Sequence, residues 1–151
     1  MATHIALLRG INVGGHNKVA MADLREVVTS LGHADVVTYI QSGNVVFTAG
    51  EPEPDTRALA SGLEQAIATA LGVRPAVIVL SREDLAQAVR DNPYASEPSP
   101  KCVHAVLFAE PPPALAAALR AAAMAPSSAL AIVFVSASGS PAVNTTLPLW
   151  M

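Results

Sequence analysis

Two β-branched and aromatic runs lie close together in the sequence, and their spacing strongly limits the folds open to the chain. VVTYIQ (36–41) and NVVFTA (44–49) meet at the turn residues Ser42-Gly43-Asn44, which is the pattern of a β-hairpin. A helical pattern and a strand pattern lie on either side of it, so the order up to residue 80 is strand, helix, strand, strand, helix, strand. That order is typical of the split βαβ, or ferredoxin-like, topology. We therefore predict an α+β protein whose first unit is a ferredoxin-like βαββαβ fold.

Helix boundaries in this first unit follow from residue spacing and end signals. In ADLREVVTSL (22–31) apolar residues recur at helical spacing, and Gly32 stands where a left-handed glycine ends many helices. Asp55 or Thr56 can accept the first free N–H groups of a second helix that runs to about Leu71. We expect strands at 4–9, 36–41, 44–49 and 76–80, and helices at 22–31, from 55 or 56 to about 71, and from 81 to about 90.

The second half of the chain has the pattern of a second unit that stops early. NPYASEPSPK (92–101), with three prolines and two serines, is the best candidate for a linker. Beyond it the sequence predicts a strand at 102–108, a helix within 111–124 and a strand at 129–135, followed by an irregular tail. A complete second unit would need a hairpin partner, another helix and a final strand. We therefore expect a ferredoxin-like βαββαβ unit at 1–91, a Pro/Ser-rich linker at 92–101, and a second, incomplete βαβ unit at 102–151.

The bulk composition narrows the classes of function. The 151 residues are 52% hydrophobic and 14% charged with a net charge of −3, so the chain can bury a core but lacks an overall basic character. Nucleic acid is therefore not expected as a partner. The single cysteine, Cys102, excludes an internal disulfide and a multi-cysteine metal site. No apolar run suits a membrane span or a signal peptide, and we expect a soluble cytoplasmic protein that does not bind membranes.

Ten polar or flexible residues, RGINVGGHNK (9–18), lie between the first strand and the first helix, which is more than a plain connection needs. In the predicted topology the end of the first strand, the hairpin turn and the start of the strand at 76–80 share one edge of the sheet. The loop is therefore expected beside residues 41–44 and near Arg74. Its glycines permit positive φ and close approach of the backbone to an anion, while its cations and amides can donate hydrogen bonds. The candidate ligand-binding residues are Arg9, Gly10, Asn12, Gly14, Gly15, Lys18, Gln41, Ser42 and Asn44, with His16 and Asn17 beside them.

Three functions are compatible with this edge. The first is binding of a small anionic ligand or an acidic partner group. The second is an enzyme of unassigned reaction, with Arg9 or Lys18 as electrophile and His16 as acid or base. The third is a structural or interaction protein in which the loop is only a connector. A P-loop is disfavoured, because His16 and Asn17 follow Gly15 where phosphate-binding loops have Lys and then Ser or Thr.

Other candidate chemistry in the sequence is weaker. The four histidines lack the spacing of metal ligands, so we expect no metal and no cofactor. Cys102 and His104 fall on one side of a predicted strand and could form a nucleophile and its base, but a buried thiol beside a surface histidine is the simpler interpretation. Tyr39 and Phe47 lie on the hairpin strands. Because the signature of RNA-binding aromatic sheets is absent, we expect both rings to pack in the core.

Two motifs together resemble a known family. ALLRGINVGGHNKVAMADLREVVTSLG (6–32), followed by VVTYIQSGNVVF (36–47), is similar to the start of the domain of unknown function 1697 family (DUF 1697). The paired motifs RGINVGG and YIQSGN are specific in combination, and the similarity continues more loosely to Asn92-Pro93-Tyr94. The resemblance implies a bacterial α+β protein with ferredoxin-like βαβ units, and it supplies no catalytic residues. The two signature motifs are the two segments that the topology places at one edge.

The C-terminal part departs from that family pattern. Family members usually continue into a basic stretch that contains Arg-Asn-Trp, whereas this sequence reads NTTLPLWM (144–151). The second unit is therefore expected to be incomplete, divergent or completed by a partner. A strand at 129–135 without its usual neighbour would expose an edge, and a homodimer formed through that edge is a hypothesis.

Overall fold

The structure is a computed structural model that describes residues 1–50, 55–90, 92, 103–107 and 129–132. The chain forms two compact units, Met1–Glu83 and Asp84–Met151. The division falls near the start of α3 (Arg82–Arg90), which matches the third helix that the sequence predicts.

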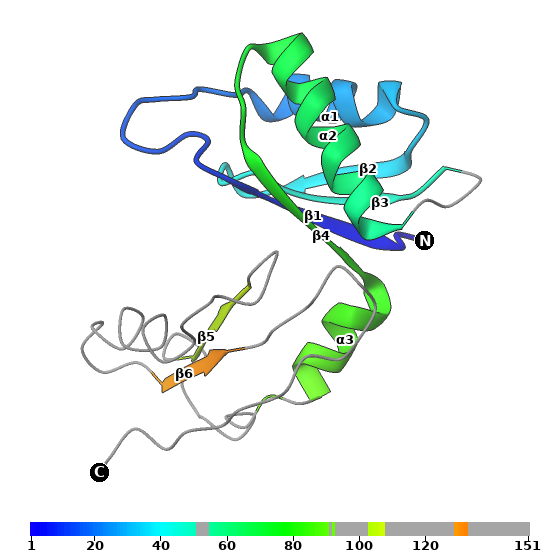
Figure 1. Ribbon diagram of the computed structural model, residues 1–151, viewed down its shortest axis with the longest axis vertical. Helices are drawn as coiled ribbons and strands as arrows, with labels where there is room; N and C mark the ends of the chain where they lie inside the picture. Colours follow the sequence, from blue (N-terminus) through cyan, green and yellow to red (C-terminus); the bar gives the residue numbers. More distant parts are fainter. Residues whose placement is uncertain (51–54, 91, 93–102, 108–128, 133–151) are drawn as a thin grey trace. The chain divides into compact units, whose positions relative to one another are not determined.

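Unit 1 is a mixed α+β fold in which two helices lie on one face of a four-stranded antiparallel sheet (Figure 1). Its elements are β1 (His4–Arg9), α1 (Met21–Ser30), β2 (Ala34–Tyr39), β3 (Asn44–Thr48), α2 (Thr56–Leu71) and β4 (Ala76–Ser81). The strand order is β2-β3-β1-β4, so β3 lies between β1 and β2. Leu7 pairs with Asn44, and Arg9 pairs with Ala76. The end of β1 and the starts of β3 and β4 therefore lie at one edge of the sheet.

The hairpin forms where the sequence predicts it, but its first strand is shifted. β2 begins at Ala34 and ends at Tyr39, whereas the sequence predicted 36–41. Ile40 ends the strand because its backbone is left-handed, with φ +53°, a conformation that β-branched residues rarely adopt. The pairing register is irregular between Ala34 and Val37, where Asp35 also has a positive φ. These departures leave a short, irregular edge strand.

The helix ends follow the end signals in the sequence. The backbone N–H of Gly32 donates to the Thr29 carbonyl at 3.0 Å, and the glycine has φ +87°, as a helix-ending glycine should. At the start of α2 the Asp55 carboxylate accepts from the Ala58 N–H at 2.8 Å, so Asp55 and not Thr56 is the N-cap. These two predictions are confirmed.

The core of unit 1 lies between the helices and one face of the sheet. Val45 and Phe47 alternate along β3 with half-buried neighbours, and both are fully buried. The predicted core position is confirmed for Phe47 but wrong for Tyr39, whose side chain is 68% exposed. Tyr39 pairs with Asn44 and not with a buried residue, so the pleat places its ring on the sheet face opposite the helices. The other members of the core are Ala6, Leu8, Ile11, Val19, Leu24, Val27, Val28, Leu59, Leu63, Ile67, Val73, Val77 and Val79.

The described part of unit 2 contains the two strands that the sequence predicts there. β5 (Val103–Val106) and β6 (Ala129–Ile132) pair in parallel. A parallel pair needs a long connection, and the chain between these strands is long enough to make one. The helix predicted within 111–124, the irregular tail and all of the predicted linker except Asn92 lie outside the described residues. None of the described helices is long and apolar enough to cross a membrane.

Candidate functional site

The connection after β1 folds into a small hairpin of its own. The His16 N–H donates to the Val13 carbonyl at 3.0 Å, and Gly14 and Gly15 between them have φ values of +58° and +81°. Two successive positive φ values define a type I′ turn, which glycine accommodates without strain. The Asn12 N–H donates to the Asn17 carbonyl at 3.0 Å and closes the hairpin below the turn.

The Asn12 side chain holds this hairpin to the rest of the unit. Its amide nitrogen donates to the carbonyls of Val19 at 2.9 Å and Gln41 at 2.8 Å, and its carbonyl oxygen accepts from the Val19 N–H at 2.8 Å. Asn17 acts similarly on a smaller scale, because its amide donates to the Gly10 carbonyl at 2.8 Å. Both asparagines were candidates for direct ligand contacts. In the structure their amides bind backbone, which gives them the role of positioning the loop.

The hairpin turn between β2 and β3 packs directly against the loop. The Leu8 N–H donates to the Gly43 carbonyl at 3.2 Å, and Gly43 has φ +86°. A Cβ atom on Gly43 would collide with the Ile11 side chain and would lie 3.0 Å from the Leu8 Cβ. The segments 9–18 and 41–44 are therefore neighbours, as the topology predicts, and glycine is required where they meet. We call these two segments together with Arg74 the loop edge.

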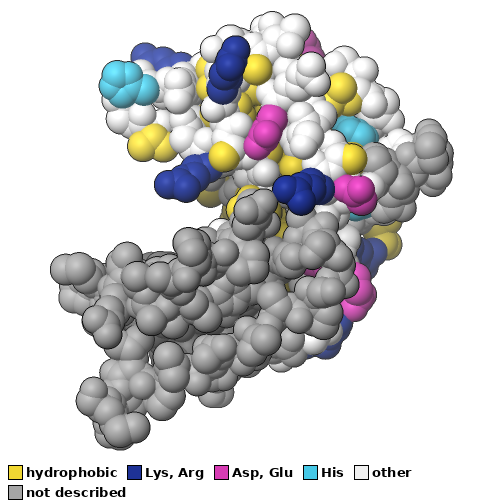
Figure 2. Space-filling view, in the orientation of Figure 1, with side chains coloured by type: hydrophobic (Ala, Val, Ile, Leu, Met, Phe, Trp, Pro, Cys, Tyr) yellow, Lys and Arg dark blue, Asp and Glu magenta, His cyan; other side chains and the backbone are white. Residues whose placement is uncertain are grey.

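Cationic side chains gather at the loop edge without acidic partners. The side chains of Arg9, Lys18 and Arg74 are exposed, and so is the ring of His16 beside them. None of these four side chains has a hydrogen bond or ion pair with the residues that the structure describes. Figure 2 shows Lys and Arg side chains, and a histidine beside them, at the end of unit 1 where the loop lies.

The remaining polar candidates lie at the turn. Gln41 and Ser42 are exposed, and Asn44 is half-buried. The Asn44 amide donates to the Ser42 hydroxyl at 3.3 Å. Gly10 has φ +82° at the point where the chain leaves β1. The structure thus brings all nine candidate residues to one edge, although the Asn12 side chain is used in hydrogen bonds to the backbone of Val19 and Gln41.

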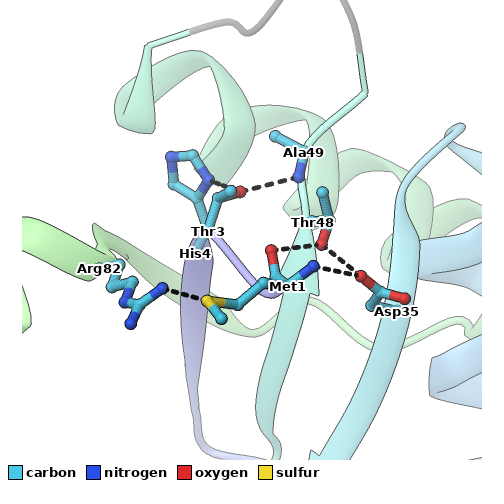
Figure 3. A network of polar contacts seen from close by, with 7 residues as sticks. All are labelled: Met1, Thr3, His4, Asp35, Thr48, Ala49 and Arg82. Carbon is cyan, nitrogen blue, oxygen red and sulfur yellow. Dashed lines mark hydrogen bonds and ion pairs between the residues drawn. The ribbon is translucent and has the colours of Figure 1, made fainter.

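The opposite end of the sheet carries a paired polar network (Figure 3). The amino group of Met1 lies 3.1 Å from the Asp35 carboxylate, which also accepts from the Thr48 hydroxyl at 2.9 Å. The hydrogen bond from Thr48, together with the amino group, lowers the pKa of Asp35 below its usual value. The Thr3 hydroxyl contacts the His4 ring nitrogen at 2.9 Å and accepts from the Ala49 N–H at 3.1 Å. These contacts join the ends of three strands and leave their polar groups satisfied.

Two histidines flank Phe47 near that network. The buried His4 ring stacks on Phe47 with centroids 5.7 Å apart, and His33 approaches Phe47 at 4.8 Å. The His33 ring nitrogen accepts from the Gly50 N–H at 3.2 Å. Burial lowers the pKa of His33, and the nearby charge of His4 lowers it further. Sequence spacing gave no sign of this cluster, because its members are distant along the chain.

The described part of the chain offers no support for a metal site or for a reactive thiol. Among the described residues no group of three His, Cys, Asp or Glu side chains could hold a metal ion. Cys102 lies outside the described residues, as does the side chain of His104, so the proposed pairing of the two falls outside the structure.

The fold and its loop edge define a class of protein: a mixed α+β chain built on a four-stranded antiparallel sheet with a cationic loop at one edge. The chain belongs to the family described as "Protein of unknown function (DUF1697)", whose model matches residues 1–133. It is similar to the solved structure of the conserved bacterial protein SP0830 from Streptococcus pneumoniae, with 36% identity and a TM-score of 0.56. That similarity covers 65% of this chain and 53% of the other, so this chain spans about half of that protein's length. A search of curated proteins gives no match.

Proposed function

We propose that unit 1 binds a small anionic ligand or an acidic partner group at the loop edge. The observation that carries this proposal is the group of exposed cations, Arg9, Lys18 and Arg74, which have no acidic partner within the described part of the chain. Cations that face solvent beside a fixed backbone can donate charge-assisted hydrogen bonds to an oxyanion. A bound anion would also relieve their mutual repulsion.

The backbone of the loop supports the same function. The N–H groups of Gly14 and Gly15 have no acceptor among the described residues, and the turn that presents them is fixed by Asn12. A binding loop that is already ordered loses little conformational entropy when its ligand arrives. The asparagine amides therefore support binding indirectly, by keeping the cations and the free N–H groups in place.

Binding is favoured over acid–base catalysis at this edge. A catalytic histidine needs a neighbour that fixes its tautomer and orientation. His16 is exposed, and no carboxylate, hydroxyl or carbonyl among the described residues bonds its ring. The enzyme hypothesis consequently lacks, among the described residues, the neighbour that would orient His16.

The test is calorimetric titration of the full chain with phosphate, pyrophosphate and citrate. Arg9→Ala and Lys18→Ala should each weaken binding about 10-fold or more, because each removes a charge-assisted hydrogen bond. Arg57→Ala is the matched control, since it removes one exposed positive charge from the first turn of α2, at the other end of the sheet. Absence of binding for every anion, or equal effects of all three substitutions, would refute the proposal.

We also propose that unit 1 has the ferredoxin-like topology. The strand order β2-β3-β1-β4 and its antiparallel pairings support this assignment. The domain limits 1–91, 92–101 and 102–151 remain a proposal of the same kind. Limited proteolysis followed by mass spectrometry would test them, because a linker should be cleaved before either unit.

A further inference from the structure

An exposed aromatic ring lies on the sheet face opposite α1 and α2. Tyr39 is 68% exposed, and Val37, two residues earlier on β2, is 60% exposed. Val37 pairs with Val46, and Tyr39 pairs with Asn44, so both lie on the face opposite the buried Val45. Scattered exposed apolar residues are ordinary, and a tyrosine alone would carry no conclusion. The position of Tyr39 relative to the loop edge is what points to a binding role.

Arg9 lies on the same face of the sheet as Tyr39. Side chains alternate along β1, so Arg9 shares a face with the half-buried Leu7 and lies opposite the buried Leu8. Leu7 pairs with Asn44, which in turn pairs with Tyr39. Arg9 is thus two strands and two residues away from Tyr39, or about 12 Å between Cα atoms from standard strand spacings. Two long side chains can close around one ligand across that distance.

We propose that the ligand of the loop edge contains a nucleotide unit, whose base stacks on Tyr39 and whose phosphate binds Arg9. This inference rests on the proposed function, because it identifies the anion that the same cations would bind. A nucleotide combines a flat ring with an oxyanion, and this face presents an aromatic ring, the apolar Val37 beside it and a cation on the same side of the sheet. Stacking on tyrosine suits any base, so recognition would be tolerant of sequence.

The overall charge of −3 does not exclude this ligand, because the relevant charge is local. Arg9, Arg74 and Lys18 bring three cations to one edge, whereas the Asp35 carboxylate is paired at the opposite end of the sheet. Few cations imply few phosphate contacts. The ligand is therefore a free nucleotide or a short single strand, and the two sources share the same chemistry.

The experiment is fluorescence anisotropy of the full chain with a fluorescein-labelled single-stranded RNA of about eight nucleotides. Competition by AMP, UMP and pyrophosphate separates the two sources. Tyr39→Ala should weaken binding of the strand or the nucleotide by about 5- to 150-fold, whereas Tyr39→Phe, which keeps the ring, should remain within about twofold. Arg9→Ala should weaken the binding of both nucleotide and pyrophosphate. It should also reduce the salt dependence of strand binding by the equivalent of about one phosphate contact. Arg57→Ala should change neither the affinity nor its salt dependence.

The outcomes separate this inference from the proposed function. Competition by AMP and UMP at affinities like that of the strand would identify free nucleotides, and competition by the strand alone would identify nucleic acid. If pyrophosphate binds through Arg9 but Tyr39→Ala leaves nucleotide affinity unchanged, the inference fails and the proposed function stands. If citrate binds through Arg9 but no phosphate compound does, the inference fails and the proposed function stands; if no anion binds, both fail. Binding only to vesicles that contain phosphatidylglycerol would overturn the inference in favour of a membrane surface. Circular dichroism of each variant checks whether the Tyr39 and Arg9 substitutions leave the fold intact.

Discussion

Replacing Asn12 with alanine should destabilise unit 1 far more than an exposed loop position normally would. Three side-chain hydrogen bonds would be lost, two to the carbonyls of Val19 and Gln41 and one from the Val19 N–H. Val19 is 6% exposed, so its N–H would lose its acceptor where water has limited access. Asn12 also has φ +54°, which asparagine tolerates better than alanine does.

The magnitude follows from these three contributions. Each net hydrogen bond contributes about 1 kcal/mol, and water can replace part of this at the partly exposed carbonyls. The buried N–H and the left-handed backbone each add about 1 kcal/mol. The expected loss is about 2–4 kcal/mol of the unfolding free energy. Asn12→Gly separates the hydrogen-bond contribution from the backbone contribution. Glycine removes the side-chain hydrogen bonds but adopts a positive φ without strain, so Asn12→Gly should cost about 1 kcal/mol less than Asn12→Ala.

Native-state hydrogen exchange of the Val45 and Phe47 amides provides the assay, since these residues lie in β3, one of the two inner strands of the sheet, and report on unit 1 alone. A loss of 2–4 kcal/mol should speed their exchange by about 30- to 700-fold. Asn44→Ala is the matched control, because it removes only one hydrogen bond at 3.3 Å and should change stability by less than about 0.5 kcal/mol. Exchange in Asn12→Ala within fivefold of the wild type would refute the positioning role of this side chain.

Three further predictions concern other positions of unit 1. Gly43→Ala should cost about 2 kcal/mol or more in urea unfolding, because its Cβ would meet Ile11 and its φ is +86°; an unchanged midpoint would contradict the packing. Asp55→Ala should cost about 1 kcal/mol by removing the cap on the Ala58 N–H, and Asp55→Asn should restore most of it. Burial lowers the pKa of His33, so the unfolded chain takes up its proton first. Stability should be complete above about pH 6.5 and should fall as the pH drops toward the folded pKa, and His33→Gln should flatten that slope.

Topology was the most informative part of the sequence, because it depends on the order of elements more than on their exact ends. That order placed RGINVGGHNK beside residues 41–44, and the hydrogen bond from Asn12 to Gln41 confirms their adjacency. Gly32 and Asp55 were also predictable, since a helix-ending glycine and an N-cap carboxylate act on their own local backbone. Strand ends were less predictable, because a left-handed Ile40 has no signal in local composition.

Two features of the site depended on contacts that the sequence does not display. Asn12 is one of several polar loop residues, and nothing local distinguishes an amide that binds solvent from one that bonds a carbonyl 29 residues away. Tyr39 lies in VVTYIQ, where apolar residues occupy both faces of the strand, so alternation could not indicate which face is buried. The pairing of Tyr39 with Asn44, whose side chain lies on the face opposite the buried Val45, fixes the face. Exposure of Tyr39 is therefore a property of the assembled sheet.

The two ends of the sheet differ in a way that supports the proposed function. At one end a charged carboxylate, Asp35, is matched by an amino group and a hydroxyl, as expected where polar groups serve the fold. At the loop edge the neutral amides of Asn12 and Asn17 are matched in the same way, but Arg9 and Lys18 have no partner within the described residues. Holding like charges together beside a rigid turn contributes nothing to the stability of the fold. An arrangement that fixes the backbone while leaving its cations free is therefore better explained by a ligand that carries the opposite charge.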